Sequence, residues 1–174
     1  TEEFHNYNKD RNQYWPHALS TTSTHDTKRS EDVRARLNVL SEIPDQWKKV
    51  INRWHKLNID KKTARGQEKI PSKNDEYLLY QTLVGSWPLY PMDATAHMEY
   101  IERINQYMNK AVKEAKVHTS WINPLEGYEK AMKAFIDQVL QPDGNNTFLQ
   151  ELKEFITSLT LPGLYNSLSQ TLLK

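Results

Sequence analysis

The sequence predicts a mainly α-helical fold with one strand-like segment near the N-terminus. Apolar residues recur at spacings of three and four along most of the chain, which gives a helix one apolar face. A single run rich in threonine and serine, residues 18–24, favours extended structure because β-branched residues prefer strands. No second run of this kind is available to pair with it, so we expect little or no sheet.

The N-terminal part predicts a helix followed by this strand-like run. Residues 1–18 are polar and aromatic, and a helix there should end before Pro16, since a residue that precedes proline avoids the helical conformation. The run then leads directly into His25-Asp26-Thr27-Lys28-Arg29. Ser30 is a suitable N-cap for the next helix, whose first turn is acidic as the helix dipole prefers.

The rest of the chain predicts a series of helices separated by polar segments. Residues 58–73, with the charge run Asp60-Lys61-Lys62, are interpreted as a solvated loop, and Leu161-Pro162-Gly163 as a break between two helices. The further helices are expected to begin at Pro44, at Asn74 and at Asp93 or Thr95, and to carry the apolar stripes Tyr128–Val139, Phe148–Leu159 and Leu164–Leu172.

Composition excludes several classes of protein. The chain has 174 residues, a net charge of +1, 5 glycines and no cysteine. The balanced charge argues against a nucleic-acid partner, and no apolar stretch approaches the ~18 residues that a membrane helix needs, so we expect no membrane partner. Without cysteine or histidine pairs at ligand spacing, neither a metal nor another cofactor is expected. The N-terminus has no signal peptide, and we interpret the chain as a piece of a longer protein.

His25 and Asp26 form the strongest candidate for chemistry. They follow the strand-like run and precede a helix, which is the position where parallel α/β barrels place catalytic groups. An imidazole and a carboxylate presented there could bind sugar hydroxyls, and the anion could stabilise developing positive charge. The alternative is that Asp26 only caps a helix. Trp87 and Trp121 lie in expected loops, where they could stack on sugar rings or cover the core.

Several ordered motifs resemble maltooligosyl trehalose synthases, which belong to the α-amylase family of glycoside hydrolases. The family's last shared motif ends in His-Asp, and the resemblance covers nearly the whole chain. The matching segments are residues 23–36, Asn74–Leu83, Gly85–Pro88, Ala115–Trp121 and Pro162–Leu168.

The resemblance implies a fold in which this chain is part of a larger enzyme. It implies a helical subdomain inserted late in a (β/α)8 barrel, with residues 1–30 a remnant of the barrel that carries one strand and the His-Asp motif, and residues 31–174 the helical insertion. The implied reaction is an intramolecular transglycosylation in a cytoplasmic enzyme. It converts the reducing-end α-1,4 linkage of a maltooligosaccharide into an α,α-1,1 linkage.

The resemblance also implies roles for single residues. Asp26 would be the third carboxylate, which stabilises the transition state, and His25 would bind the same sugar. Lys28, Arg29 and Trp121 are further candidates for substrate binding. Retaining transfer also needs a nucleophile and an acid close together, and neither of these motifs occurs here, so the chain alone is expected to be inactive.

Two alternatives remain open at this stage. The chain could be a helical interaction domain without a catalytic role, in which His25 and Asp26 only cap a helix. It could also be a carbohydrate-binding domain, which would present Trp87 and Trp121 on an exposed platform.

Overall fold

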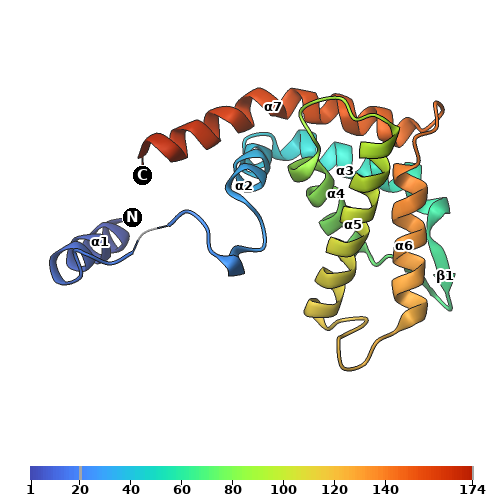
Figure 1. The fold of residues 1–174 in the computed structure, drawn as a ribbon, viewed down its shortest axis with the longest axis horizontal. Coiled ribbons are helices and arrows are strands. Elements are labelled where there is room, and N and C mark those ends of the chain that lie inside the picture. Colours follow the sequence, from blue (N-terminus) through green and yellow to red (C-terminus); the bar gives the residue numbers. More distant parts are fainter. Residues whose placement is uncertain (20, 174) are drawn as a thin grey trace. The chain divides into compact units, whose positions relative to one another are not determined.

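The computed structural model describes residues 1–19 and 21–173, which form two compact units, Thr1–Glu31 and Asp32–Lys174. Both units are helical where they have regular structure, apart from one short hairpin in the second (Figure 1). The mainly helical fold predicted from the apolar periodicity is therefore confirmed. Within the described part, no helix is long and apolar enough to cross a membrane.

The first unit contains one α-helix and one short 3-10 turn. Helix α1 (Glu2–Tyr14) ends before Pro16, as predicted, and the 3-10 turn η1 covers His25–Thr27. The strand expected over residues 18–24 is absent from the described residues of that run, and Ser20 lies outside them. Hydroxyl groups explain the difference: the Thr21 side chain donates a hydrogen bond of 2.7 Å to the Ser23 carbonyl, a local bond that competes with strand pairing.

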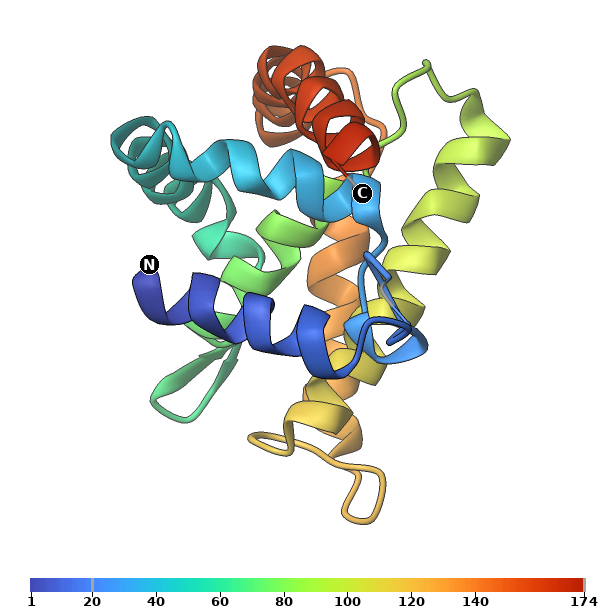
Figure 2. The same cartoon turned by 90° about the vertical axis from the view of Figure 1, so that its left-hand side faces the viewer.

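The second unit is a bundle of helices. Helices α5 and α6 lie side by side, while α7 runs alongside α3 and across one end of α4, α5 and α6 (Figure 1). Figure 2 shows the same helices from the side. Asp93 caps α5 as predicted, whereas α4 is capped by Ser72, two residues before the expected Asn74. The helices are α2 (Glu31–Asn38), α3 (Pro44–Asn58), α4 (Lys73–Ser86), α5 (Ala94–Ala115), α6 (Glu126–Leu140) and α7 (Thr147–Leu173), with short 3-10 turns η2 (Val39–Ser41) and η3 (Ile59–Lys61).

The segment 58–73 is more ordered than a solvated loop. It contains η3 and an antiparallel hairpin of β1 (Thr63–Arg65) and β2 (Glu68–Ile70), in which Thr63 pairs with Ile70. Gly66 adopts a positive φ of 60° in the connecting turn, a conformation that glycine tolerates without strain. The prediction of a loop was wrong here because two three-residue strands are too short to produce a periodic sequence signal.

The expected break at Leu161-Pro162-Gly163 does not occur, and α7 continues through Pro162. Pro162 has no N–H to donate to the carbonyl of Ser158, but both residues are exposed, so water can reach that carbonyl. Contacts with α2 hold the helix beyond this point: the Asn166 amide donates to the Ala35 carbonyl at 3.1 Å and the Ser167 hydroxyl to Asp32 at 2.8 Å.

The centre of the core is Trp54, which is 1% exposed. Its indole meets the surrounding rings edge-on at centroid distances of 5.4–5.9 Å, a favoured geometry for aromatic pairs. These rings belong to α3, α4 and α7, so one residue joins three helices. The partners are Trp47, Tyr80, Phe148 and Phe155.

Helices α2 and α4 approach closely at Gly85, which leads to a test of packing. A Cβ at this position would lie 2.7 Å from Cγ1 of Val33, a β-branched residue with little freedom to move. We expect Gly85→Ala to lower the free energy of unfolding by roughly 1–3 kcal/mol, as overpacking does, even though alanine favours helices. Urea unfolding of the purified chain measures this.

The matched control is Gly127→Ala, because a Cβ there meets nothing within 4 Å and α6 should be unchanged or more stable. Adding Val33→Ala to Gly85→Ala should restore part of the loss. A Gly85→Ala protein as stable as the Gly127→Ala protein would contradict the close approach of α2 and α4.

Candidate functional site

His25 and Asp26 lie together on η1 in the first unit. The His25 Nε2 atom is 3.2 Å from Asp26 Oδ2, and the two side chains are 89% and 75% exposed. The structure therefore presents both groups to the surrounding solvent and not to a core. An imidazole and a carboxylate in this arrangement can bind neighbouring hydroxyl groups of one ligand.

Hydrogen bonds within the loop hold the turn that carries this pair. The Asp26 N–H donates to Thr24 Oγ1 at 3.2 Å, and the Thr24 N–H donates to Thr27 Oγ1 at 2.6 Å, which together form a capping box. The Glu31 carboxylate accepts from the Thr22 and Ser23 hydroxyls at 2.7 and 2.5 Å. The threonines and serine that suggested a strand thus build a loop that positions the pair.

The capping box bears on the alternative role of Asp26. The side chain that caps η1 belongs to Thr24, and Asp26 contributes its backbone N–H to that cap. The carboxylate of Asp26 instead points to His25. This arrangement favours an interaction role for the carboxylate over a capping role.

Lys28 and Arg29 follow the pair in the same loop. Lys28 is exposed and has a left-handed backbone, with φ 64° and ψ −18°, where the chain turns after η1. Arg29 is half-buried. The structure therefore brings the four candidates His25, Asp26, Lys28 and Arg29 together in one short loop.

Trp121 belongs to the second unit, in the loop between α5 and α6, and is 60% exposed. The Lys113 ammonium lies 4.9 Å from the centroid of its ring, within the range of a cation–π contact. The same ammonium pairs with Glu129 Oε2 at 3.0 Å. An exposed indole supported in this way offers an apolar surface for a sugar ring.

The loop that carries Trp121 is anchored by buried Thr119. Its hydroxyl donates to Glu129 Oε1 at 2.7 Å and accepts from the Leu125 N–H at 2.8 Å. Burial acts to raise the pKa of Glu129, but the hydrogen bond from Thr119 and the charge of Lys113 outweigh it and hold that pKa below its usual value. Glu129 thus stays ionised and keeps both Thr119 and Lys113 in place.

Trp87 does not share this exposed setting. It is 7% exposed and packs against the rings of Tyr100 and His97 at centroid distances of 5.1 and 5.9 Å. A binding platform built from both Trp87 and Trp121 is therefore wrong, because Trp87 is a core residue. Trp87 is the C-cap of α4, where its backbone N–H donates to the Leu83 carbonyl at 3.0 Å.

The structure also contains a buried polar network that the sequence analysis did not predict. Glu76 accepts hydrogen bonds at 2.7 Å from Lys62, 2.7 Å from His55 and 2.8 Å from Tyr80. The Lys62 side chain is 2% exposed, so the expectation that Asp60-Lys61-Lys62 is fully solvated was wrong for this residue. Burial, and then the charge of Glu76, raise the pKa of Tyr80. The one available signal was the spacing of four between Glu76 and Tyr80 on α4.

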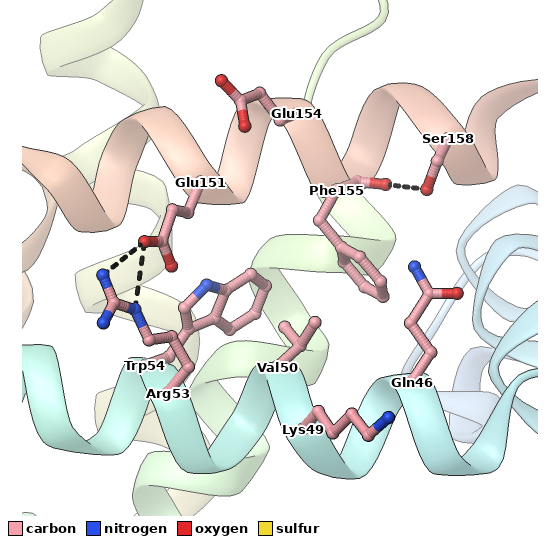
Figure 3. A pocket seen from close by; sticks show the side chains of 9 residues that line it. All are labelled: Gln46, Lys49, Val50, Arg53, Trp54, Glu151, Glu154, Phe155 and Ser158. Carbon is pink, nitrogen blue, oxygen red and sulfur yellow. Dashed lines mark hydrogen bonds and ion pairs between the residues drawn. The ribbon is translucent and has the colours of Figure 1, made fainter.

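A groove of about 440 Å³ lies between α3 and α7, with Trp54, Val50 and Phe155 at its base. Figure 3 shows Arg53 of α3 reaching Glu151 of α7 across one end, where Nε and one terminal nitrogen lie 3.1 and 3.0 Å from Oε1. None of the candidate residues lines this groove. Among the described residues, no cluster of three or more histidine, aspartate or glutamate side chains could hold a metal ion.

Comparison with known proteins shows what this chain is similar to. It is 37% identical over 138 residues to a Mycobacterium tuberculosis protein assigned as a maltooligosyl trehalose synthase, which covers 79% of this chain and 16% of that protein. A crystal structure of maltooligosyl trehalose synthase matches 99% of this chain and 21% of its own, with 36% identity and a TM-score of 0.80. The DSM5389 glycosyltrehalose synthase matches the same shares with 41% identity and a TM-score of 0.75. No family model matches the chain.

These relatives form one class, synthases that are named for a trehalose-containing product, and the chain is homologous to one segment of that class. It spans about a fifth of their length. Two of these relatives are named maltooligosyl trehalose synthase, so the resemblance identified from the sequence motifs is confirmed.

Proposed function

We propose that this chain acts as one segment of a maltooligosyl trehalose synthase. The observation that carries the proposal is similarity in sequence and fold over 99% of the chain to a solved synthase, together with an exposed His-Asp pair. In the reaction, the reducing-end α-1,4 linkage of a maltooligosaccharide becomes an α,α-1,1 linkage within the same molecule. Such an isomerase belongs to carbohydrate metabolism, and we assign it to the cytoplasm.

In this proposal, the exposed loop of the first unit supplies one part of the catalytic machinery. Glycosyl transfer passes through a transition state with positive charge on the sugar, and the Asp26 carboxylate stabilises that charge. His25 binds a hydroxyl of the same sugar, and Lys28 and Arg29 hold neighbouring hydroxyls. Trp121 stacks on a sugar ring of the substrate.

The two units take different parts in the proposed enzyme. Residues 1–30 belong to a (β/α)8 barrel, where the His-Asp loop follows a barrel strand. Residues 31–174 form a helical insertion in that barrel. Both assignments rest on the likeness to the synthases.

We expect the isolated chain not to convert maltopentaose into its trehalose-ended isomer. A retaining double displacement needs a nucleophile and an acid about 5–5.5 Å apart, and Asp26 alone cannot supply both. The purified chain and the full-length synthase that contains it are incubated with maltopentaose, and the products are separated by chromatography.

The full-length protein should produce the non-reducing isomer and the isolated chain should not. Turnover by the isolated chain that is lost in its Asp26→Asn variant would contradict the proposal that the nucleophile and the acid lie outside this segment. A full-length protein that leaves maltopentaose unchanged would contradict the proposed function itself.

A further inference from the structure

The apolar face of α7 changes sides at Pro162. Before the proline, the apolar residues lie on the face of the helix that packs against the bundle. From the residue just before the proline onward, leucines recur at positions 161, 164, 168 and 172, which an α-helix of 3.6 residues per turn places on the opposite face. The buried residues of the first half are Phe148, Leu149, Leu152, Phe155, Ile156 and Leu159.

The contacts with α2 confirm which way the second half of α7 faces. Gly163 is buried so closely against α2 that a Cβ there would lie 3.2 Å from the Arg36 Cα. Asn166 and Ser167 donate hydrogen bonds to the same helix. These three residues lie on the side of α7 opposite the leucines, which therefore face away from the second unit.

We call Leu161, Leu164, Leu168 and Leu172 the leucine stripe. Their exposed fractions are 55%, 49%, 56% and 77%. Tyr165, which borders the stripe, is 60% exposed. Four leucines aligned on one face differ from single exposed apolar residues, which are normal on a protein surface, and such a patch marks an interaction site.

The charged residues of α7 all lie in its first half. No charged residue occurs between Glu154 and Lys174, so the second half of the helix has no charged face for water. A surface helix ordinarily turns its apolar stripe toward the core and its polar residues toward water. Here the order is reversed, because the side with Asn166 and Ser167 contacts α2 and the leucines are exposed. Helix α2 packs against one side of this half. The leucine stripe, on the other side, has no packing partner among the described residues of the second unit.

We propose that the leucine stripe packs against another part of the same synthase polypeptide, outside this segment. This inference rests on the proposed function. The solved synthase matches 99% of the chain, α7 included, yet this match covers only 21% of that protein, so most of its chain is available as a cover. The partner surface should be apolar, since the stripe offers no charge and no hydrogen-bonding side chain.

The test compares one charged variant in two settings. Leu164→Glu/Leu168→Glu is made in the 174-residue chain and in the full-length synthase, and apparent Tm is measured for each. In the 174-residue chain we expect a change of about 2 °C or less, because both leucines face water. In the full-length protein we expect a loss of roughly 5 °C or more, since two charges then enter an apolar contact.

The matched control is Leu89→Glu, a leucine that is 50% exposed but lies outside the stripe, and it should change Tm little in either setting. Equal losses in both settings would overturn the proposal and show that the leucines support the fold of this unit. An unchanged full-length protein would overturn it as well. If the change instead abolished a dimer in sedimentation without lowering Tm of the monomer, the cover would be a second copy.

This comparison is independent of the proposed reaction. A full-length protein without activity on maltooligosaccharides would refute the proposed function. The difference in Tm between the 174-residue chain and the full-length protein would still show whether the leucine stripe packs against another part of the polypeptide. Conversely, normal activity with no difference in Tm would refute only the proposed packing of the leucine stripe.

Discussion

Replacing Asp26 with asparagine is expected to lower kcat of the full-length synthase by about 10²–10³-fold or more, because one aimed electrostatic group contributes that much to catalysis. Asparagine has the same shape and can still bind a hydroxyl, but it lacks the negative charge that, in the proposed mechanism, stabilises the positively charged transition state. The Asp26 side chain is 75% exposed, so Tm should hardly change. The measurement is kcat with a maltooligosaccharide, together with Tm of the same variant.

Two further variants separate catalysis from local structure. Asp10→Asn makes the same change at an exposed aspartate of α1 and should leave kcat unchanged. Thr24→Ala removes the side chain that caps η1 and should loosen the loop, with a smaller effect on kcat than Asp26→Asn. An Asp26→Asn enzyme with nearly normal kcat would place Asp26 among the structural residues.

Replacing Glu76 with alanine should cause a large loss of stability. The change leaves the ammonium of Lys62, whose side chain is 2% exposed, without its charged partner. Breaking a buried pair by removing one partner typically costs about 3–5 kcal/mol, because the remaining charge is buried and uncompensated. The free energy of unfolding of the 174-residue chain in urea measures the effect.

An exposed ion pair provides the control. Glu126 pairs with Lys130 at 3.0 Å, but the two side chains are 77% and 79% exposed, so Glu126→Ala should have little effect. The double variant Lys62→Met/Glu76→Met should recover much of the stability lost in Glu76→Ala, since apolar residues of similar size often replace a buried pair without loss. A Glu76→Ala chain that unfolds like the wild type would show that water reaches Lys62.

Local signals were sufficient to predict several helix boundaries. Pro16 marks the end of α1, Pro44 begins α3 and Asp93 caps α5, where it accepts from the Ala96 N–H at 2.8 Å. Each of these signals acts within one helical turn, so no distant contact is needed to produce it. The His25-Asp26 pair was likewise visible as a motif, and its exposure on a capped turn is the feature that the structure adds.

Features that depend on residues distant in the sequence were predicted wrongly or not at all. Leu161-Pro162-Gly163 indicates a helix break, yet α7 continues because Gly163 fits against Arg36 of α2, a contact that no local pattern contains. Trp87 and Trp121 have similar settings in the sequence, but only Trp121 is exposed, because the rings of Tyr100 and His97 cover Trp87.

The sequence by itself determined the helical class, several helix boundaries and the relationship to maltooligosyl trehalose synthases, because periodicity, caps and ordered motifs are local properties of the chain. Only the tertiary structure decided which charges are buried and which apolar faces are covered. Lys62 and Lys61 are neighbours with the same charge, yet only Lys62 is enclosed, since it reaches Glu76 of α4 and the Pro71 carbonyl. Burial depends on which segments meet in space, and a single sequence read locally does not contain that information.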